Sequence, residues 1–181
     1  MGLINKINDL LKTQSPVVVA IDGRCASGKT TLADKLCGKL SCCCIHMDDF
    51  FLQPHQRTPE RLQQTGGNID HERFLSEVLI PMSQRIPFSY RPFNCKTMSF
   101  NEPVHITPDR VTIIEGVYSC HPLFRKFYDL TVFLDVSADM QRERIMKRSP
   151  MLADKFFTSW IPMEEKYFTE FDIRNNCDMM L

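Results

Sequence analysis

The most informative segment of the chain is Gly23-Arg24-Cys25-Ala26-Ser27-Gly28-Lys29-Thr30, which matches the pattern G-x-x-x-x-G-K-[S/T] without a gap. Glycines near both ends of this loop allow the backbone to curl, so that successive N–H groups point towards phosphate oxygens. We expect Lys29 to reach the β- and γ-phosphates of ATP as a catalytic cation, and the Thr30 hydroxyl to bind Mg²⁺. The residues that this pattern predicts to bind nucleotide are Gly23, Ala26, Ser27, Gly28, Lys29, Thr30 and Thr31.

The sequence on either side of this loop fits a phosphate-binding site. Residues 16–21 form a continuous apolar run rich in β-branched side chains, which is typical of a strand buried on both faces of a parallel sheet. A helical pattern follows over residues 30–40, and the N-terminus of that helix would face the same anion. We therefore interpret residues 23–30 as a P-loop between a strand and a helix.

Strand and helix patterns alternate along the rest of the chain. Further strands are predicted at residues 42–46, 111–114, 130–134 and 177–181. Helices are predicted at residues 3–11, 70–85, 138–148 and 156–171. This alternation predicts an α/β fold of the three-layer P-loop NTPase type, with a central, mostly parallel sheet of about five strands. Residues 1–181 are predicted to form a single domain.

Two stretches interrupt the alternation. Residues 51–68 are polar and contain prolines and two adjacent glycines, so we predict a long loop. Residues 87–107 combine prolines with alternating aromatic and polar side chains, which favours a small hairpin or flap. Long loops in a compact domain are usually functional.

Composition argues against several classes of protein. The 181 residues include 22 Lys and Arg and 22 Asp and Glu, and this formal net charge of zero argues against nucleic-acid or anionic-lipid binding. No apolar run approaches the roughly 18 residues of a membrane span, and residues 1–13 lack a signal-peptide pattern. The eight cysteines contain no C-x-x-C pair, so we expect reduced thiols, with residues 42–44 in a buried strand. We expect a cytoplasmic protein whose partner is a small molecule, and leave a homo-oligomer open.

A P-loop alone does not identify a reaction. A GTPase would need D-x-x-G and N-K-x-D motifs, and the chain contains no D-x-x-G. Motor and transport ATPases are normally larger or are built into rings. A kinase that acts on a small molecule is therefore favoured.

Acidic residues follow two of the predicted strands directly. Asp48 and Asp49 come after strand 42–46, where the carboxyl ends of parallel strands face the ligand. One of the two is placed to accept a hydroxyl proton or to hold water on Mg²⁺, and a helix cap or solvated turn is the alternative. Glu115 follows strand 111–114, where a carboxylate could order Mg²⁺-bound water or contact the phosphate acceptor, and a charge at a strand terminus is the alternative.

Four segments recur in the same order in a known family. The P-loop, Asp-Asp-Phe-Phe at 48–51, Asn-Ile-Asp-His at 68–71 and Ile-Glu-Gly-Val-Tyr at 114–118 resemble motifs of the uridine kinase and phosphoribulokinase-like P-loop kinases. The resemblance runs from about residue 16 to residue 148. It implies that Asp48 is the base towards a sugar 5′-hydroxyl and that Asp70 binds the ribose hydroxyls. A helix N-cap would equally explain an acid at position 70.

The resemblance also implies a basic helical lid that closes over the phosphates. Such a lid neutralises charge in the transition state. Its basic residues would be Arg142, Arg144, Lys147 and Arg148, which we do not rank. Arg144 and Arg148 are included among the predicted nucleotide-binding residues.

The acceptor side departs from the uridine kinase pattern. Phe51 stands where those kinases have tyrosine, and residues 86–94 replace the segment around the uracil ring. The candidate substrate-binding residues are Asp70, Phe51, Tyr90, Arg91 and Glu115, and the candidate metal ligands are Thr30, Asp48 and Glu115. The histidines at positions 46, 55, 105 and 121 receive no role.

The expected function is transfer of the ATP γ-phosphoryl group to a nucleoside hydroxyl, with ATP and Mg²⁺ as cofactors. Residues 48–51 and 160–163 also resemble nicotinamide riboside kinases. A kinase for nicotinamide riboside or pantothenate is therefore the near alternative. A regulatory module that binds ATP without transferring phosphate is the distant one.

Overall fold

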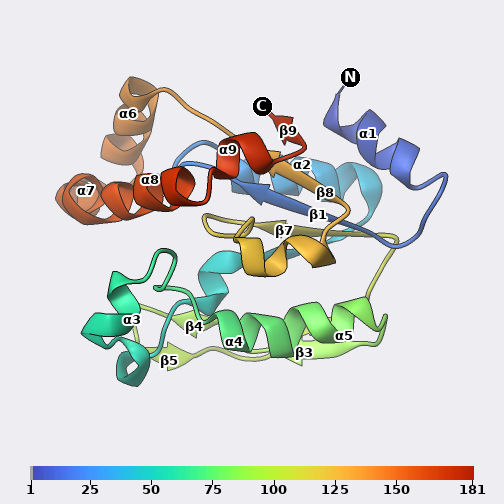
Figure 1. Ribbon diagram of the computed structural model, residues 1–181, viewed down its shortest axis with the longest axis horizontal. Coiled ribbons are helices and arrows are strands. Elements are labelled where there is room, and N and C mark those ends of the chain that lie inside the picture. The colour runs from blue at the N-terminus through green and yellow to red at the C-terminus, as the bar shows by residue number, and fades with distance from the viewer. Residues whose placement is uncertain (1) are drawn as a thin grey trace.

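The computed structural model describes residues 2–181, which contain a five-stranded parallel sheet (Figure 1). The strands stand in the order β2-β7-β1-β8-β9, and each neighbouring pair is parallel. Their bounds are Val17–Asp22 (β1), Cys43–His46 (β2), Val111–Glu115 (β7), Leu130–Phe133 (β8) and Met179–Met180 (β9). The predicted α/β P-loop fold with a parallel sheet of about five strands is confirmed, and the last strand is shorter than predicted.

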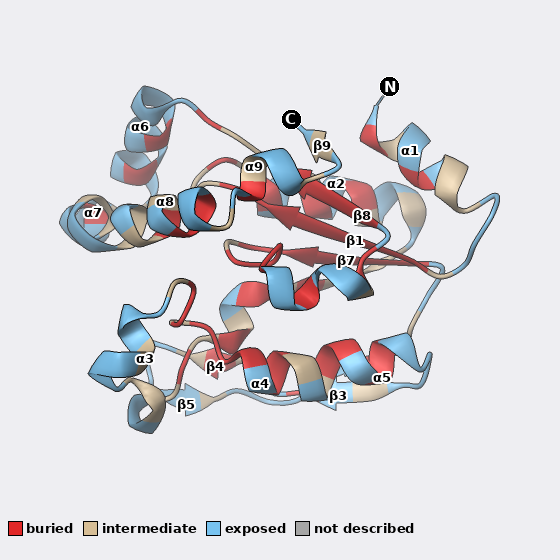
Figure 2. Ribbon diagram, in the orientation of Figure 1, coloured by how far each residue is buried: buried red, intermediate tan, exposed pale blue. Residues whose placement is uncertain are grey.

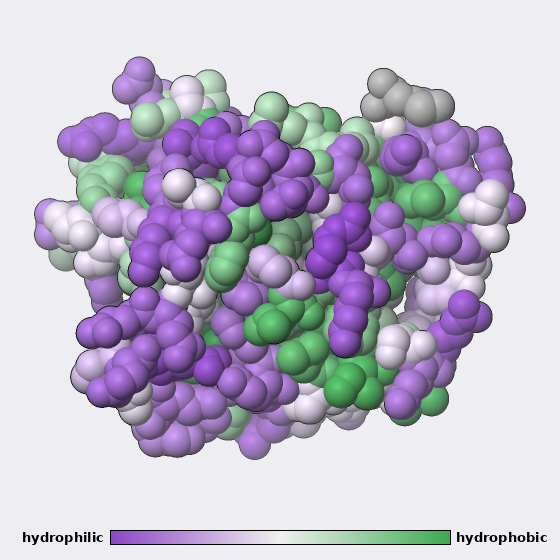
Figure 3. All heavy atoms as spheres, viewed as in Figure 1, coloured by the Kyte–Doolittle hydropathy of each residue, from purple (hydrophilic) through white to green (hydrophobic). Residues whose placement is uncertain are grey.

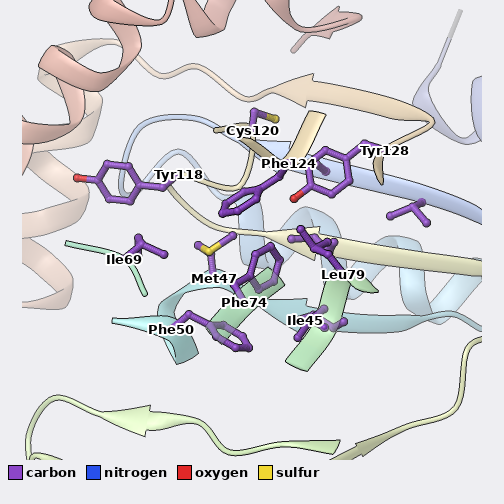
Figure 4. Packing of buried hydrophobic residues seen from close by; sticks show 14 of the residues in the cluster. Ile45, Met47, Phe50, Ile69, Phe74, Leu79, Tyr118, Cys120, Phe124 and Tyr128 are labelled. Carbon is purple, nitrogen blue, oxygen red and sulfur yellow. The ribbon is translucent and has the colours of Figure 1, made fainter. Parts of the chain in front are cut away.

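The central strand β1 is buried along its whole length because helices cover both faces of the sheet (Figure 2). Its odd-numbered apolar residues, from Val17 to Ile21, pack with α1 (Leu3–Leu10) and α2 (Lys29–Leu40) on one face. Val18 and Ala20 belong to the core on the other face, which Met47, Phe50, Phe74 and Phe124 fill (Figure 4). A strand that is covered on both faces needs no polar alternation, which explains the continuous apolar run.

A long helix on the second face contains α4 (His71–Phe74), a π-helical turn at Leu75–Leu79 and α5 (Ile80–Ser83). A second π-helical turn, at Phe156–Trp160, leads into α8 (Ile161–Glu170). Each turn comes directly before a helical segment with proline as its second residue, Pro81 or Pro162. Proline has no N–H to donate to the preceding turn, so the regular hydrogen-bond ladder is interrupted there.

The predicted flap consists of two short antiparallel pairs of strands. β3 (Phe88–Tyr90) pairs with β6 (Val104–Ile106), and β4 (Phe93–Asn94) pairs with β5 (Ser99–Phe100). Here the expectation of a hairpin holds.

Residues 51–68 contain more regular structure than the predicted loop. A 3-10 turn at Pro54–Gln56 is followed by α3 (Pro59–Gln63). Thr58 caps α3 by accepting the Arg61 N–H over 3.2 Å, and the Arg61 guanidinium donates to the carbonyl oxygens of Gly67 and Ile69. Side-chain hydrogen bonds to the backbone thus order a polar segment that has no apolar periodicity.

The chain after β8 forms four helices, of which the first, α6 (Ala138–Arg148), contains the basic residues of the predicted lid. The others are α7 (Ala153–Lys155), α8 and α9 (Ile173–Asn176). Figure 1 shows α6, α7 and α8 gathered on one side of the molecule, beyond the end of the sheet towards which β1 points. Shorter 3-10 turns occur at Met47–Phe50, Pro122–Phe127 and Pro150–Leu152.

The face shown in Figure 3 is mainly hydrophilic, with apolar atoms near its centre. No helix within residues 2–181 is long and apolar enough to cross a membrane. All eight cysteines are free; Cys95 is exposed, Cys120 is buried and the others are half-buried. The cysteines at 42–44 are less buried than predicted because β2 is an edge strand.

Candidate active site

The P-loop connects β1 to α2 and encloses the Lys29 ammonium group. Lys29 Nζ donates hydrogen bonds to the carbonyl oxygens of Gly23, over 2.7 Å, and Arg24, over 2.8 Å. Gly23 has φ +135°, and a Cβ there would lie 2.0 Å from the Leu134 carbonyl oxygen, so no larger residue fits. Ser27 Oγ is buried and has no hydrogen-bond partner within residues 2–181. A bound anion could satisfy this orphaned hydroxyl group.

Asp22 anchors the start of the loop and was not predicted from the sequence. Its Oδ1 accepts the Gly23 N–H over 2.7 Å. Its Oδ2 accepts the Cys120 N–H over 2.9 Å and the Tyr167 hydroxyl over 2.8 Å. Burial raises the pKa of Asp22, while these hydrogen bonds and Lys29 act in the opposite direction. The P-loop, the segment after β7 and helix α8 therefore meet at one carboxyl group.

Glu115 joins the ends of three elements. It is paired in register with His46 of β2 and Ile21 of β1. Its Oε1 accepts the Thr30 hydroxyl over 3.0 Å and lies 2.7 Å from His46 Nδ1. The hydrogen bond to Glu115, opposed by burial, raises the pKa of His46. The structure thus brings the predicted residues Thr30 and Glu115 together and adds His46, to which no role was given.

The two acids after β2 have different surroundings. Asp49 Oδ2 accepts the Tyr90 hydroxyl over 3.1 Å, so Asp49 is tied to the flap. Asp48 is more exposed and makes no side-chain hydrogen bond to any residue from 2 to 181. Crowding by surrounding protein atoms, and then the Glu115 carboxylate, raises the pKa of Asp48, although its side chain keeps contact with solvent. Asp48 is therefore the better placed of the two to act as a base.

The candidate metal ligands suit Mg²⁺. Thr30, Asp48 and Glu115 supply hydroxyl and carboxylate oxygens, which are the hard ligands that this ion prefers. Within residues 2–181 no group of three or more His, Cys, Asp or Glu residues could hold a metal by itself. This is compatible with Mg²⁺, which usually binds through one or two carboxylates together with phosphates and water.

Asp70 lies at the N-terminus of α4 in a network of polar side chains. Its Oδ1 accepts the Arg73 N–H over 3.0 Å, which makes Asp70 the N-cap of α4. Its Oδ2 accepts a hydrogen bond from Gln56 Nε2 over 2.8 Å. The cap considered as an alternative is thus present in the structure, and ribose binding by Asp70 stays a prediction.

The Arg73 guanidinium links the acceptor side to the flap. It lies 4.5 Å from the ring centroid of Phe50 and 5.0 Å from that of Phe100. It donates to the Asp49 carbonyl oxygen over 2.5 Å and to that of Arg91 over 2.6 Å. Arg73 therefore supports the turn that carries Asp48 and Asp49, a role for which the sequence contains no motif.

The other predicted substrate-binding residues are placed differently from one another. Phe51 is half-buried against the core and its backbone forms a bridge with Ile69. Tyr90 is buried and contacts Asp49 as described. The Arg91 guanidinium instead donates to the carbonyl oxygens of Phe100 and Asn101 on the flap itself. The structure does not bring Arg91 to Asp48.

Of the two lid arginines predicted to bind nucleotide, Arg144 and Arg148, one contacts the P-loop. Arg144 Nη1 donates to the carbonyl oxygens of Ala26, over 2.9 Å, and Ser27, over 3.0 Å. The Arg148 guanidinium instead lies 5.9 Å from the centroid of the Phe156 ring, in the π-helical turn before α8. Side chains that were not predicted also reach the loop: Glu164 accepts the Cys25 N–H, and Gln141 donates to the Cys25 carbonyl oxygen.

Comparison with known proteins shows what the chain is similar to. It is 30% identical over 146 residues to a uridine kinase of Oceanobacillus iheyensis, covering 75% of this chain and 67% of that protein. It is 28% identical over 149 residues to uridine kinase-like protein 5 of Arabidopsis thaliana, covering 75% of this chain. The chain spans about a third of the length of that plant relative, 31%. No protein-family model matches the chain.

A solved structure has the same fold. The structure of a possible uridine kinase from Bacillus stearothermophilus superimposes with a TM-score of 0.71 over the full length of both chains. Its sequence identity is 23%, so this likeness concerns the fold.

Proposed function

The chain belongs to the uridine kinase family of P-loop kinases, and on that basis we propose that it transfers the γ-phosphoryl group of ATP to the 5′-hydroxyl group of a nucleoside. The observation that carries this proposal is the convergence of Lys29, Thr30, Glu115 and Asp48 at the carboxyl edge of the sheet. Thr30 and Glu115 are hydrogen-bonded to each other, and Glu115 influences the pKa of Asp48. The residues that we propose as phosphate cradle, metal ligands and base therefore lie close together.

Each group of residues at this edge has a separate role in the proposed phosphoryl transfer. The P-loop N–H groups and the Lys29 ammonium bind and orient the phosphates. Thr30 and the nearby carboxylates would hold Mg²⁺, which would supply positive charge to the bound phosphates. Asp48 orients the acceptor hydroxyl group and accepts its proton at a carboxylate oxygen. Arg144, which contacts two P-loop carbonyl oxygens, is placed to contribute charge from the lid side.

The acceptor is proposed to be a nucleoside because Asp70 and Gln56 form a hydrogen-bonded pair near Asp49, to which Arg73 connects them. A carboxylate and an amide can together bind the two hydroxyl groups of a ribose. To do so, Asp70 Oδ2 would exchange its bond with Gln56 for a bond with the sugar.

The deciding experiment measures ADP release with ATP, Mg²⁺ and a panel of acceptors. The panel contains uridine, cytidine, nicotinamide riboside and pantothenate, and Lys29→Ala serves as the inactive control. Nucleoside-dependent ADP release by the wild type alone would support the proposal. Release with pantothenate only would identify a different acceptor, and ATP binding without release under any condition would indicate a regulatory module.

A further inference from the structure

Helix α8 directs a carboxylate at the backbone of the P-loop. Glu164 Oε2 accepts the Cys25 N–H over 2.9 Å, and the Glu164 residue is only 6% exposed. The neighbouring Glu165 binds the side chain of Arg24 over 2.6 Å and, within residues 2–181, accepts no hydrogen bond from the loop backbone. Two adjacent acids of one helix therefore contact two adjacent P-loop residues in different ways.

The position of Glu164 conflicts with the chemistry expected of this loop. The N–H groups of a P-loop, together with its lysine, form an anion-binding cradle. A buried carboxylate that occupies one of these donors is an anion within that cradle, and Lys29 favours its charged form. When the triphosphate enters, Glu164 would confront several further negative charges at close range, where like charges in a partly dehydrated site repel strongly.

The surroundings of Glu164 keep it in place. Tyr167, one turn further along α8, is bonded to Asp22, and Glu165 is bonded to Arg24. Gln141 of α6 donates a hydrogen bond to the Cys25 carbonyl oxygen over 3.0 Å. Helices α6 and α8 therefore both bind the backbone of Cys25. Withdrawal of α8 from the loop would break several of these contacts. Uptake of a proton would remove the repulsion without breaking any of them.

We propose that Glu164 is a residue of the nucleotide site that takes up a proton when ATP binds, and that its carboxylate opposes ATP binding until it does so. The carboxyl group then stays beside the P-loop as a neutral acid. Its O–H can donate a hydrogen bond to a phosphate oxygen, a contact that the carboxylate cannot make. This inference rests on the proposed nucleotide site.

The electrostatic environment is consistent with this behaviour. Burial raises the pKa of Glu164 to about 7, against the lowering effects of the Cys25 N–H and Lys29. The charged or titratable groups around it are Cys25, Arg24 and Lys29 of the P-loop, Asp22 of β1, Tyr118 after β7, and Glu165 and Tyr167 of α8. A carboxyl group with this pKa is mostly ionised at pH 8, so the Glu164 side chain can take up a proton at that pH.

Calorimetry of nucleotide binding tests the proposal directly. Wild-type protein is titrated at pH 8 with Mg²⁺ and a non-hydrolysable ATP analogue, in buffers of different ionisation enthalpy. We expect uptake of roughly one proton per nucleotide by the wild type and none by Glu164→Gln, which keeps the shape and an acceptor for the Cys25 N–H. Glu165→Gln is the matched control and should still take up the proton.

The affinity should change in parallel. Glu164→Gln should bind the analogue about tenfold more tightly than the wild type at pH 8, and about twofold more tightly at pH 7. Nucleotide binding by the wild type without proton uptake, or with proton release, would overturn the inference and leave the kinase proposal standing. If neither protein binds the nucleotide, the proposed function fails and this inference fails with it. If Glu164→Gln does not fold, the wild-type measurement can still overturn the inference, and Glu164→Ala then serves to assign the proton.

Discussion

The Tyr167 hydroxyl group donates a hydrogen bond to Asp22 Oδ2 over 2.8 Å, across a separation of 145 residues in the sequence. Both side chains are fully buried. The contact links α8 to the end of β1, one residue before the P-loop begins. Helix α8 and the P-loop are therefore joined through the interior of the molecule.

Tyr167→Phe should lower the free energy of unfolding by about 1–3 kcal/mol, because the Asp22 carboxyl group loses a buried donor. Tyr128→Phe is a matched control, since the buried Tyr128 hydroxyl has no hydrogen-bond partner within residues 2–181. That substitution should be nearly neutral or stabilising. Urea denaturation of the two variants measures the difference, and equal losses in both would contradict the importance of the contact.

Asp48→Asn should lower kcat by about 10²–10⁴, the usual contribution of a general base, and should leave the affinity for ATP nearly unchanged. Asp49→Asn is the comparison, because Asp49 is bonded to Tyr90 and lies beside the flap. Its effect on kcat should be smaller. Steady-state kinetics of both variants would show whether the base is instead Asp49, in which case the order of the two effects is reversed.

Asp70→Ser separates the two roles of Asp70. Serine is a good N-cap residue, so α4 and the melting temperature should change little, but the carboxylate that would bind a ribose diol is removed. We expect a higher KM for the nucleoside, an unchanged KM for ATP and a loss of the preference for ribonucleosides over 2′-deoxynucleosides. An unaltered preference in a well-folded variant would leave Asp70 as a helix cap only.

His121 should make the protein less stable in mild acid. Burial, and then the neighbouring His71, lowers the pKa of His121 to about 4, from an ordinary value of 6.5. Below pH 6.5 the unfolded chain binds a proton that the folded protein excludes, so this contribution to stability is present above pH 6.5 and is lost as the pH falls towards 4. The sign follows from a folded-state pKa below the unfolded one.

His121→Asn removes this titration and keeps an acceptor for the Leu123 N–H, which His121 Nδ1 binds over 3.3 Å. The loss of unfolding free energy between pH 7 and pH 5 should be smaller in the variant by about 2 kcal/mol. Chemical denaturation at the two pH values measures it. Identical losses in variant and wild type would show that His121 does not contribute.

The features predicted correctly from the sequence have local signals. The P-loop is a contiguous pattern, the buried strand β1 is a contiguous apolar run, and Glu115 directly follows another such run. The parallel sheet follows from the alternation of such segments. Spacing along the chain was sufficient for these features because each depends on neighbours in the sequence.

The remaining site residues depend on contacts between distant segments. Glu164 and Cys25 are 139 residues apart, and His46 and Glu115 are 69 residues apart. These contacts depend on the strand order and on the path of the helices after β8. An isolated acid or histidine in the sequence does not predict either of them. The sequence pattern did not reveal helix α3 in the polar segment 51–68. This helix is stabilised by its N-cap and by Arg61, and it has no apolar face that periodicity could detect. Binding roles for Arg91 and Arg148 remain predictions.

The exposed thiol of Cys95 provides a site on the flap for a fluorescent label. Cys95 is exposed and lies between β4 and β5, whereas burial raises the pKa of Cys25, Cys42, Cys43, Cys44 and Cys120 and so disfavours their reactive thiolates. A maleimide fluorophore should therefore attach first at Cys95 in the unmodified protein. Emission from that position would report flap movement during turnover, without any need to engineer a new cysteine.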